Sequence, residues 1–179
     1  MSHEKRGNSD EWYTPKWVFD AMELKFQMDV ASPEDDSQCC VPAMERITKT
    51  KVIVKLPDDD EETFYDSPGG LVAMWRGLVW MNPPYGNQAD KMEWIMRFAQ
   101  HDNIVALMPD RTSSSWWQSI ANASHSIVIP KSKIKFTDPE GKTAGHPPTG
   151  STFFAKGEEA VKGLENIARK GLGTHWKRL

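Results

Sequence analysis

The sequence predicts an α/β fold: a mostly parallel sheet with helices on both faces and an antiparallel C-terminal edge. Short apolar strands alternate with helical patterns, which is typical of parallel sheets that are covered on both faces. The last two predicted strands follow one another without a helix, which favours an antiparallel pair. The chain has 179 residues, of which 39% are hydrophobic, so residues 11–179 are expected to form one domain after a flexible arm at residues 1–10.

Few helices and strands are predicted in the N-terminal part of the chain. Apolar residues recur at helical spacing over Trp17–Leu24, with Thr14 as the N-cap and Pro15 in the first turn, where proline is tolerated. The short apolar run Met28–Ala31 predicts a buried strand. Residues 33–70 are predicted to be rich in loops, with one hairpin.

Most of the predicted strands and helices lie from residue 51 onward. Strands are predicted at Lys51–Leu56, Gly77–Met81, Ile104–Met108, Ser126–Ile129, Lys133–Phe136 and Ser151–Ala155. Helices are predicted at Ala89–Gln100, Ser113–Ala123 and Glu158–Lys170. In the first of these helices, the residues expected to share one apolar face are Met92, Ile95, Met96 and Ala99.

Composition excludes several classes of protein. No apolar run approaches the roughly 20 residues needed to cross a bilayer, and the polar N-terminus is unlike a signal peptide. A cytoplasmic protein that does not engage a membrane is therefore expected. The two cysteines, Cys39 and Cys40, are adjacent, with no CxxC pattern or histidine cluster around them, so we expect reduced thiols and no metal site.

Charge is unevenly distributed along the chain. The formal net charge of -3 excludes a globally basic nucleic-acid binder, yet the acidic runs PEDDS and PDDDEE contrast with the basic runs PKSKIKF and HWKRL. A local basic patch can still bind DNA. Lys131, Lys133 and Lys135 alternate, which places them on one face of an extended segment, where they suit phosphates. The alternative is a solvated edge strand in which lysine discourages aggregation.

The segment VWMNPPYG, residues 79–86, ends an apolar strand in an amide and a Pro-Pro bend. In a doubly wound sheet, ligands bind at the carboxyl ends of the strands, where Asn82 is expected. The Asn82 side-chain oxygen and the Pro83 carbonyl are acceptors, and neither Pro83 nor Pro84 has a backbone N–H beside them. With the Tyr85 ring, they suit a planar heterocycle that carries an exocyclic amino group, such as adenine. A plain proline-rich turn is the competing interpretation.

Asn-Pro-Pro-Tyr after a buried strand resembles the catalytic motif of amino-group methyltransferases that use S-adenosyl-L-methionine. The blocks EWYTPKWVFDAM, MDVASP, GGLVAMWRGLVWMNPPYG, ALMPDRTSSSWWQ and KSKIKFTDPEGKTAGHPPTGSTFF resemble the phage-type DNA N6-adenine methyltransferase (Dam) family. The resemblance implies a Rossmann-like methyltransferase fold, S-adenosyl-L-methionine as cofactor, no metal, and adenine N6 in double-stranded DNA as acceptor, with the base flipped out. It also implies a phage or prophage protein that modifies DNA, for protection from restriction, in the cytoplasm of a bacterial host.

The same resemblance implies roles for single residues. Asn82 and Pro83 would hold N6, Pro84 would form the bend, and Tyr85 would stack on the base. The implied cofactor-binding residues are Trp12, Tyr13, Thr14, Pro15, Asp29, Ala31, Ser32 and Asn82. The helix start at Thr14 offers N–H groups to the carboxylate of the cofactor, unless this segment only caps the helix.

Asp29 would accept a hydrogen bond from the ammonium group of the cofactor. The chain departs from the broad family pattern here, because Ser32-Pro33 stands where a glycine is usual after Asp29. The candidates for binding the ribose hydroxyls are Asp35, Asp36 and Asp66.

The implied DNA-binding residues are Arg111, Thr112, Trp116, Lys131, Lys133 and Lys135. Arg111 and Thr112 follow a strand end on the same edge as Asn82, whereas Trp116 can also belong to the core. Two alternatives stay open. The acceptor can be another amino group, on cytosine N4, an RNA base or protein glutamine, or the chain can bind nucleic acid without catalysis. No separate target-recognition domain is recognisable, which predicts a short or relaxed recognition site.

Overall fold

The computed structural model describes residues 13–35, 39–55, 61–84, 86, 88–137, 142–143 and 149–178. The predicted flexible arm, residues 1–10, lies outside the described residues. The same holds for three residues with predicted roles, Trp12, Asp36 and Tyr85.

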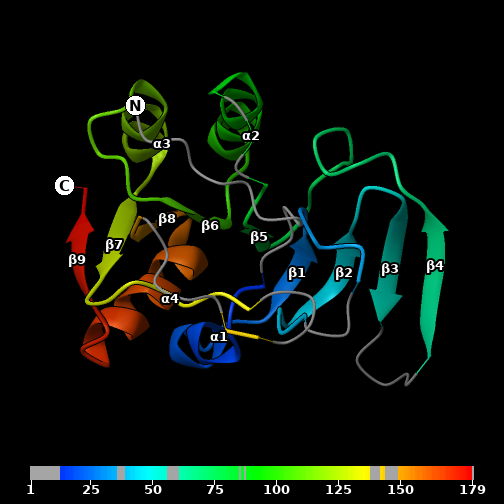
Figure 1. The fold of residues 1–179 in the computed structure, drawn as a ribbon, viewed down its shortest axis with the longest axis horizontal. Coiled ribbons are helices and arrows are strands. Elements are labelled where there is room, and N and C mark those ends of the chain that lie inside the picture. The colour runs from blue at the N-terminus through cyan, green and yellow to red at the C-terminus, as the bar shows by residue number, and fades with distance from the viewer. Residues whose placement is uncertain are drawn as a thin grey trace.

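One nine-stranded sheet runs through the described residues (Figure 1). Its strands are β1 (Phe26–Asp29), β2 (Ala43–Ile47), β3 (Lys51–Lys55), β4 (Glu62–Asp66), β5 (Val79–Met81), β6 (Ile104–Pro109), β7 (Ser126–Pro130), β8 (Ser151–Lys156) and β9 (Gly173–Lys177). They lie in the order β4-β3-β2-β1-β5-β6-β8-β7-β9.

The centre of the sheet is parallel and both of its edges are antiparallel. The pairs β1–β2, β1–β5 and β5–β6 are parallel, whereas β2–β3, β3–β4, β6–β8, β7–β8 and β7–β9 are antiparallel. The predicted antiparallel C-terminal edge is confirmed. The prediction of a mostly parallel sheet is wrong, because a second antiparallel edge, β2–β3–β4, extends the N-terminal side.

That second edge arises in the stretch predicted to be rich in loops. Strands β2 and β4, with sequences AMERI and ETFYD, carry charges that weaken their strand signal. The fold satisfies these charges by pairing. Arg46 on β2 lies 2.6 Å from Glu62 on β4, and Arg76 pairs with Glu45 on β2. Because these charges are paired only in the folded chain, the sequence alone predicts loops where β2 and β4 form.

The predicted strand Lys133–Phe136 is not one of the strands of the sheet. It has a strand-like alternation, since Ile134 and Phe136 are buried whereas Lys133 and Lys135 are exposed. Its buried side chains pack with the residues of the two helices α1 (Lys16–Met22) and α4 (Glu158–Arg169). The predicted pairing of this segment with Ser151–Ala155 is therefore wrong, because β8 pairs with β6 and β7 instead.

Helices cover both faces of the sheet, as predicted. Successive side chains of β6 point to opposite faces of the sheet. Val105 and Leu107 share a core cluster with α1 and α4. On the other face, Ile104, Ala106 and Met108 share a cluster with α2 (Gln88–Gln100) and α3 (Ser115–Ala123). Figure 1 shows the two helix pairs on opposite sides of the sheet. None of the helices in the described part of the chain is long and apolar enough to span a membrane.

Two helices are rotated from the predicted orientation. On α1, Trp17 is 40% exposed, although it was placed on the apolar face. On α2 the buried residues are Trp94, Ile95 and Phe98, while Met96 is 58% exposed. The two large rings, one helical turn apart, enter the core in place of the smaller side chains because they bury more apolar surface.

The topology places the site. From β1 the chain passes to β2 on one side, and it later forms β5 on the other side of β1. The carboxyl ends of the parallel strands β1 and β5 therefore flank a topological switch point, where open α/β sheets bind ligands. Asp29 ends β1, and Asn82 follows β5.

Candidate active site

A hollow lies beside the carboxyl ends of β1 and β5. Its empty volume is about 290 Å³, part of which is open to solvent. It is lined by Tyr13, Thr14, Asp29, Ala31, Pro33, Cys39, Cys40, Val41, Trp80 and Asn82. Five of these were predicted to bind a cofactor: Tyr13, Thr14, Asp29, Ala31 and Asn82. Ser32 and Pro15 do not line the hollow, and the Ser32 hydroxyl donates a hydrogen bond to the Asp29 carboxyl group.

Strand register brings the two sides of the hollow together. Asp29 on β1 pairs with Trp80 on β5, and Asn82 stands two residues further on. Side chains two residues apart along a strand point to the same side, so the Trp80 ring forms a wall of the hollow beside Asn82. That ring is held edge-on by Phe19, with centroids 5.0 Å apart. Sequence reasoning missed Trp80, although the same period of two could have found it.

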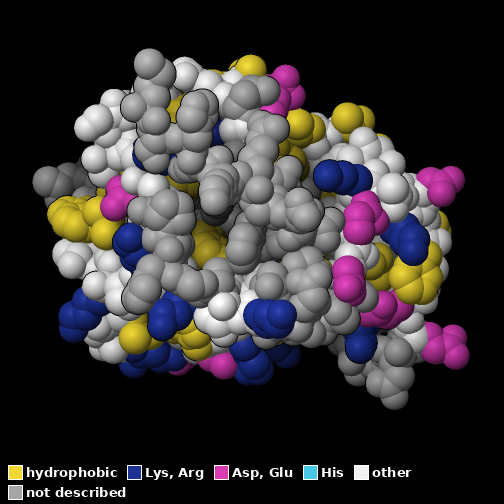
Figure 2. Space-filling view, in the orientation of Figure 1, with side chains coloured by type: hydrophobic (Ala, Val, Ile, Leu, Met, Phe, Trp, Pro, Cys, Tyr) yellow, Lys and Arg dark blue, Asp and Glu magenta, His cyan; other side chains and the backbone are white. Residues whose placement is uncertain are grey.

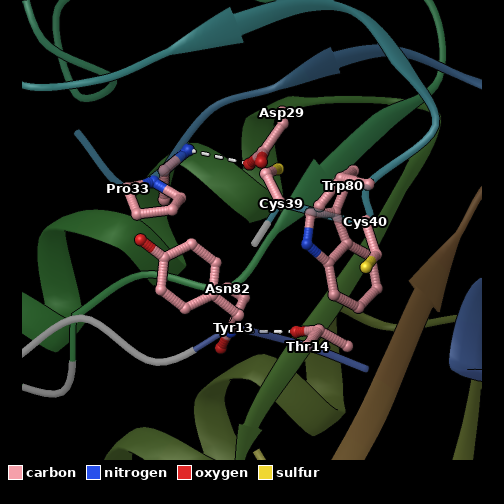
Figure 3. Close-up of a pocket in the computed structure, with 10 residues that line it drawn as sticks. Tyr13, Thr14, Asp29, Pro33, Cys39, Cys40, Trp80 and Asn82 are labelled. Carbon is pink, nitrogen blue, oxygen red and sulfur yellow. Dashed lines mark hydrogen bonds between the residues drawn. The ribbon is translucent and has the colours of Figure 1, made fainter. Parts of the chain in front are cut away.

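The remaining wall comes from the loop between β1 and β2. Cys39, Cys40 and Val41 line the hollow, with the cysteines as free thiols (Figure 3). Burial raises the pKa of the Cys39 thiol, and the nearby Asp29 carboxylate adds to this effect. The thiols were predicted to be reduced, but no sequence signal placed them at the site, since only the tertiary fold turns this loop back over β1.

Thr14 contacts the amide of Asn82 directly. The Asn82 Nδ2 donates to Thr14 Oγ1 at 3.2 Å, and Thr14 is 4% exposed (Figure 3). The prediction that Thr14 caps α1 is wrong, because Pro15 occupies the N-cap position and no side chain caps the helix. The hydroxyl of Thr14 is turned towards Asn82 instead.

Tyr13 anchors this segment from two directions. Its backbone N–H donates to the Thr137 carbonyl at 2.9 Å, and its carbonyl accepts from the Thr137 N–H at 3.1 Å. Its phenolic hydroxyl donates to the Asp35 carbonyl at 2.6 Å. The segment before α1 is thereby joined both to the end of the lysine-bearing segment and to the loop that follows β1.

The carboxylate beside the end of β2 belongs to Glu34, which was not among the predicted acidic candidates. It accepts from Thr48 Oγ1 at 3.1 Å and from the Thr50 N–H at 2.8 Å. Burial alone would raise the pKa of Glu34, but the hydrogen bonds from Thr50 and Thr48 bring it below its usual value. Of the predicted candidates, Asp66 ends the edge strand β4, and Asp35 contributes its backbone carbonyl to Tyr13.

Asp29 is a buried carboxyl group, 2% exposed, at the wall of the hollow. Burial raises its pKa to about 7, against the lowering effects of the Ala31 N–H, the Ser32 hydroxyl and the charge of Arg46. A cation placed beside it would favour the ionised form and offset the cost of burial. The carboxyl group is therefore suited to a positively charged ligand.

Asp29→Asn is expected to stabilise the fold at alkaline pH. The pKa of Asp29 is raised in the folded state, so the folded chain binds more protons than the unfolded chain between pH 3.8 and about 7. The carboxyl group therefore destabilises the fold increasingly as the pH rises through that window. The variant should gain roughly 2–4 kcal/mol at pH 8 and much less at pH 5. Urea unfolding at both pH values measures this gain, with the exposed Asp20→Asn as control, and an equal gain at both would contradict it.

The segment predicted to be catalytic, residues 82–85, is described in part. Asn82 is half-buried, Pro83 is buried and Pro84 is exposed. The Pro84 carbonyl accepts from the Gly86 N–H at 2.9 Å, which closes the bend before α2. Tyr85 lies outside the described residues, so its stacking role stays a prediction.

The predicted DNA-binding residues fall into two groups. Lys131, Lys133 and Lys135 are exposed, as are Arg111 and Thr112 after β6. Figure 2 shows Lys and Arg gathered along the lower side of the view, where α1 and α4 lie, while Asp and Glu gather over β3 and β4.

Trp116 belongs to the core. It is 6% exposed and packs in the cluster with α2 and α3. The sequence left two roles open for Trp116, core packing and a contact with DNA. The structure supports core packing.

Two comparisons relate the chain to known proteins. Residues 61–157 match the family model described as DNA N-6-adenine-methyltransferase (Dam). The chain is also 30% identical over 143 residues to the DNA N-6-adenine-methyltransferase of Haemophilus phage HP1 (strain HP1c1), which covers 78% of this chain and 73% of the phage protein. No solved structure gives a significant match. The chain therefore belongs to the DNA N-6-adenine-methyltransferase (Dam) family.

Proposed function

We propose that the hollow beside the carboxyl ends of β1 and β5 binds the amino-acid end of S-adenosyl-L-methionine. Asn82 would then present adenine N6 of DNA to the methyl group of this cofactor. Adenine-specific DNA methylation is the activity of the family to which the chain belongs. The observation that carries the proposal is the meeting of a buried carboxyl group, Asp29, and the Asn82 amide at one hollow. Cytosine N4, RNA bases, protein glutamine and non-catalytic binding have no comparable support.

The residues of the hollow fit the cofactor. The ammonium group of S-adenosyl-L-methionine would place a positive charge beside Asp29 and so favour the ionised form of this buried carboxyl group. The hollow is partly open to solvent, so one end of an elongated ligand can enter it while the rest extends outside. When bound, the cofactor would supply an electrophilic methyl carbon and a sulfonium leaving group that keeps the carbon–sulfur electron pair.

Asn82 and Pro83 would act on the amino group. An amide oxygen and a backbone carbonyl can each accept one N6 hydrogen, which favours a more tetrahedral nitrogen with its lone pair directed at the methyl group. N6 would then release one proton to solvent water after methyl transfer, so no general base from the chain is required. Tyr85 would stack on the base, which must leave the duplex to reach the site.

The fold and the surface support the same proposal. The consecutive parallel strands β2, β1, β5 and β6 have helices on both faces and a switch point at the site, as in a Rossmann-like methyltransferase core. The exposed Lys131, Lys133 and Lys135 would contact phosphates, and Arg111 and Thr112 would contact DNA near the sheet edge.

The direct test is the chemical identity of the product. The protein is incubated with plasmid DNA and S-adenosyl-L-methionine that carries a deuterated methyl group, and the DNA is digested to nucleosides for mass spectrometry. Labelled N6-methyldeoxyadenosine is expected. Labelled N4-methyldeoxycytidine, or no labelled nucleoside although calorimetry shows cofactor binding, would contradict the proposed function.

A further inference from the structure

We infer that Thr14 is a positioning residue for the Asn82 amide, rather than a helix cap or a contact to the cofactor. The inference rests on the catalytic role proposed for Asn82. Its basis is the hydrogen bond from Asn82 Nδ2 to Thr14 Oγ1, at 3.2 Å, made by a threonine that is 4% exposed.

The orientation of an asparagine amide decides what it offers to a ligand. Its oxygen accepts and its nitrogen donates, so a half-turn of the amide exchanges the two. In the reversed orientation, Asn82 would direct N–H groups at an amino group that itself donates. The hydrogen bond that Thr14 accepts from Nδ2 turns the Asn82 oxygen away from Thr14, and this is the orientation that the inferred positioning role preserves.

Thr14 is itself held independently of its hydroxyl. The neighbouring Tyr13 is paired to Thr137 by two backbone hydrogen bonds and donates through its phenol to the Asp35 carbonyl. Valine has the shape of threonine and keeps this backbone, so Thr14→Val removes the acceptor and leaves the wall of the hollow in place. The variant separates orientation from folding.

The kinetic expectation distinguishes positioning from cofactor contact. Thr14→Val should lower kcat for adenine methylation about 10- to 100-fold, because misorientation of a reacting group is costly. The Kd for S-adenosyl-L-methionine and the KM for DNA should stay within about threefold. Thr14→Ser, which restores the hydroxyl, should recover most of kcat.

A matched variant controls for the loss of a buried hydroxyl. Thr152 is fully buried on β8, and its Oγ1 accepts from Trp117 Nε1 at 3.4 Å. Thr152→Val should therefore keep the wild-type kcat. An equal loss of kcat in both valine variants would mean a general effect on the fold and would overturn the inference.

A second readout is independent of activity. In protein labelled with ¹⁵N-asparagine, the Asn82 side-chain amide signal is identified by its loss in Asn82→Ala. Its protons should exchange more slowly with water in the wild type and Thr14→Ser than in Thr14→Val. Equal exchange, failed rescue by serine, or a weakened cofactor Kd with unchanged kcat overturns the inference. A wild type that forms no N6-methyladenine refutes the proposed function, while the amide signal still decides whether Thr14 holds Asn82.

Discussion

Replacing Asn82 with alanine is expected to lower the rate of methyl transfer by about a thousandfold or more, with the cofactor Kd within about threefold of the wild-type value. Of the two proposed acceptors, the Asn82 side chain is the one that a substitution can remove, since the other is the backbone carbonyl of Pro83. Without it, one N6 hydrogen loses its acceptor and the lone pair stays delocalised into the ring. The hollow that receives the cofactor keeps Asp29, Trp80 and the loop after β1, so binding should persist.

Two measurements check this expectation. Single-turnover transfer of a labelled methyl group to DNA gives the rate, and calorimetry with S-adenosyl-L-methionine gives the Kd. Asn122→Ala is the matched control, because Asn122 is an exposed residue on α3 away from the hollow. Retention of more than about a tenth of the wild-type rate in Asn82→Ala would refute the catalytic role of this amide.

The central elements were predictable because their signal is local. The strands that became β5 and β6 are runs of apolar residues, fully buried between two helix layers, and such runs need no partner to be recognised. Strands β2 and β4 could not be recognised in this way, because they carry charges that are balanced by residues distant in sequence, such as Glu62 beside Arg46. The rotation of α2 is likewise decided by what its rings meet in the core.

The site shows the same division between local and tertiary information. Asn82 was predictable because it is a polar residue that ends a buried strand, whereas Asp29 was predicted from the family resemblance. The parallel pairing of β1 and β5 brings the two residues together. Cys39 and Cys40 were not predictable, since the loop that carries them reaches the hollow only through the fold. The contact between Thr14 and Asn82 joins residues far apart along the chain, so a local helix-cap pattern gave the wrong partner for that hydroxyl.

Replacing Lys131, Lys133 and Lys135 with glutamine is expected to weaken DNA binding about a hundredfold at low salt. All three side chains are exposed, and the neighbouring Ile134 and Phe136 are buried and hold the segment against the core. A stripe of charges on an anchored segment can contact successive phosphates without first having to become ordered. Such contacts position the duplex and carry no sequence information, so the loss should be similar for every DNA sequence.

The salt dependence of DNA binding distinguishes phosphate contacts by these lysines from the alternative, in which they only discourage aggregation at an exposed edge. Each lost phosphate contact reduces the slope of log Kd against log salt by about 0.9, so the triple variant should lose about 2.7 from the slope. Fluorescence anisotropy with a labelled duplex at several salt concentrations measures it, and kcat at saturating DNA should be unchanged. The control replaces three other exposed lysines, Lys49, Lys51 and Lys55, beside the acidic edge strand. If both triple variants bind DNA with the same slope, the stripe makes no phosphate contacts; if only the first loses slope, the DNA lies along residues 131–135 and reaches the site beside the Tyr13–Thr137 bridge.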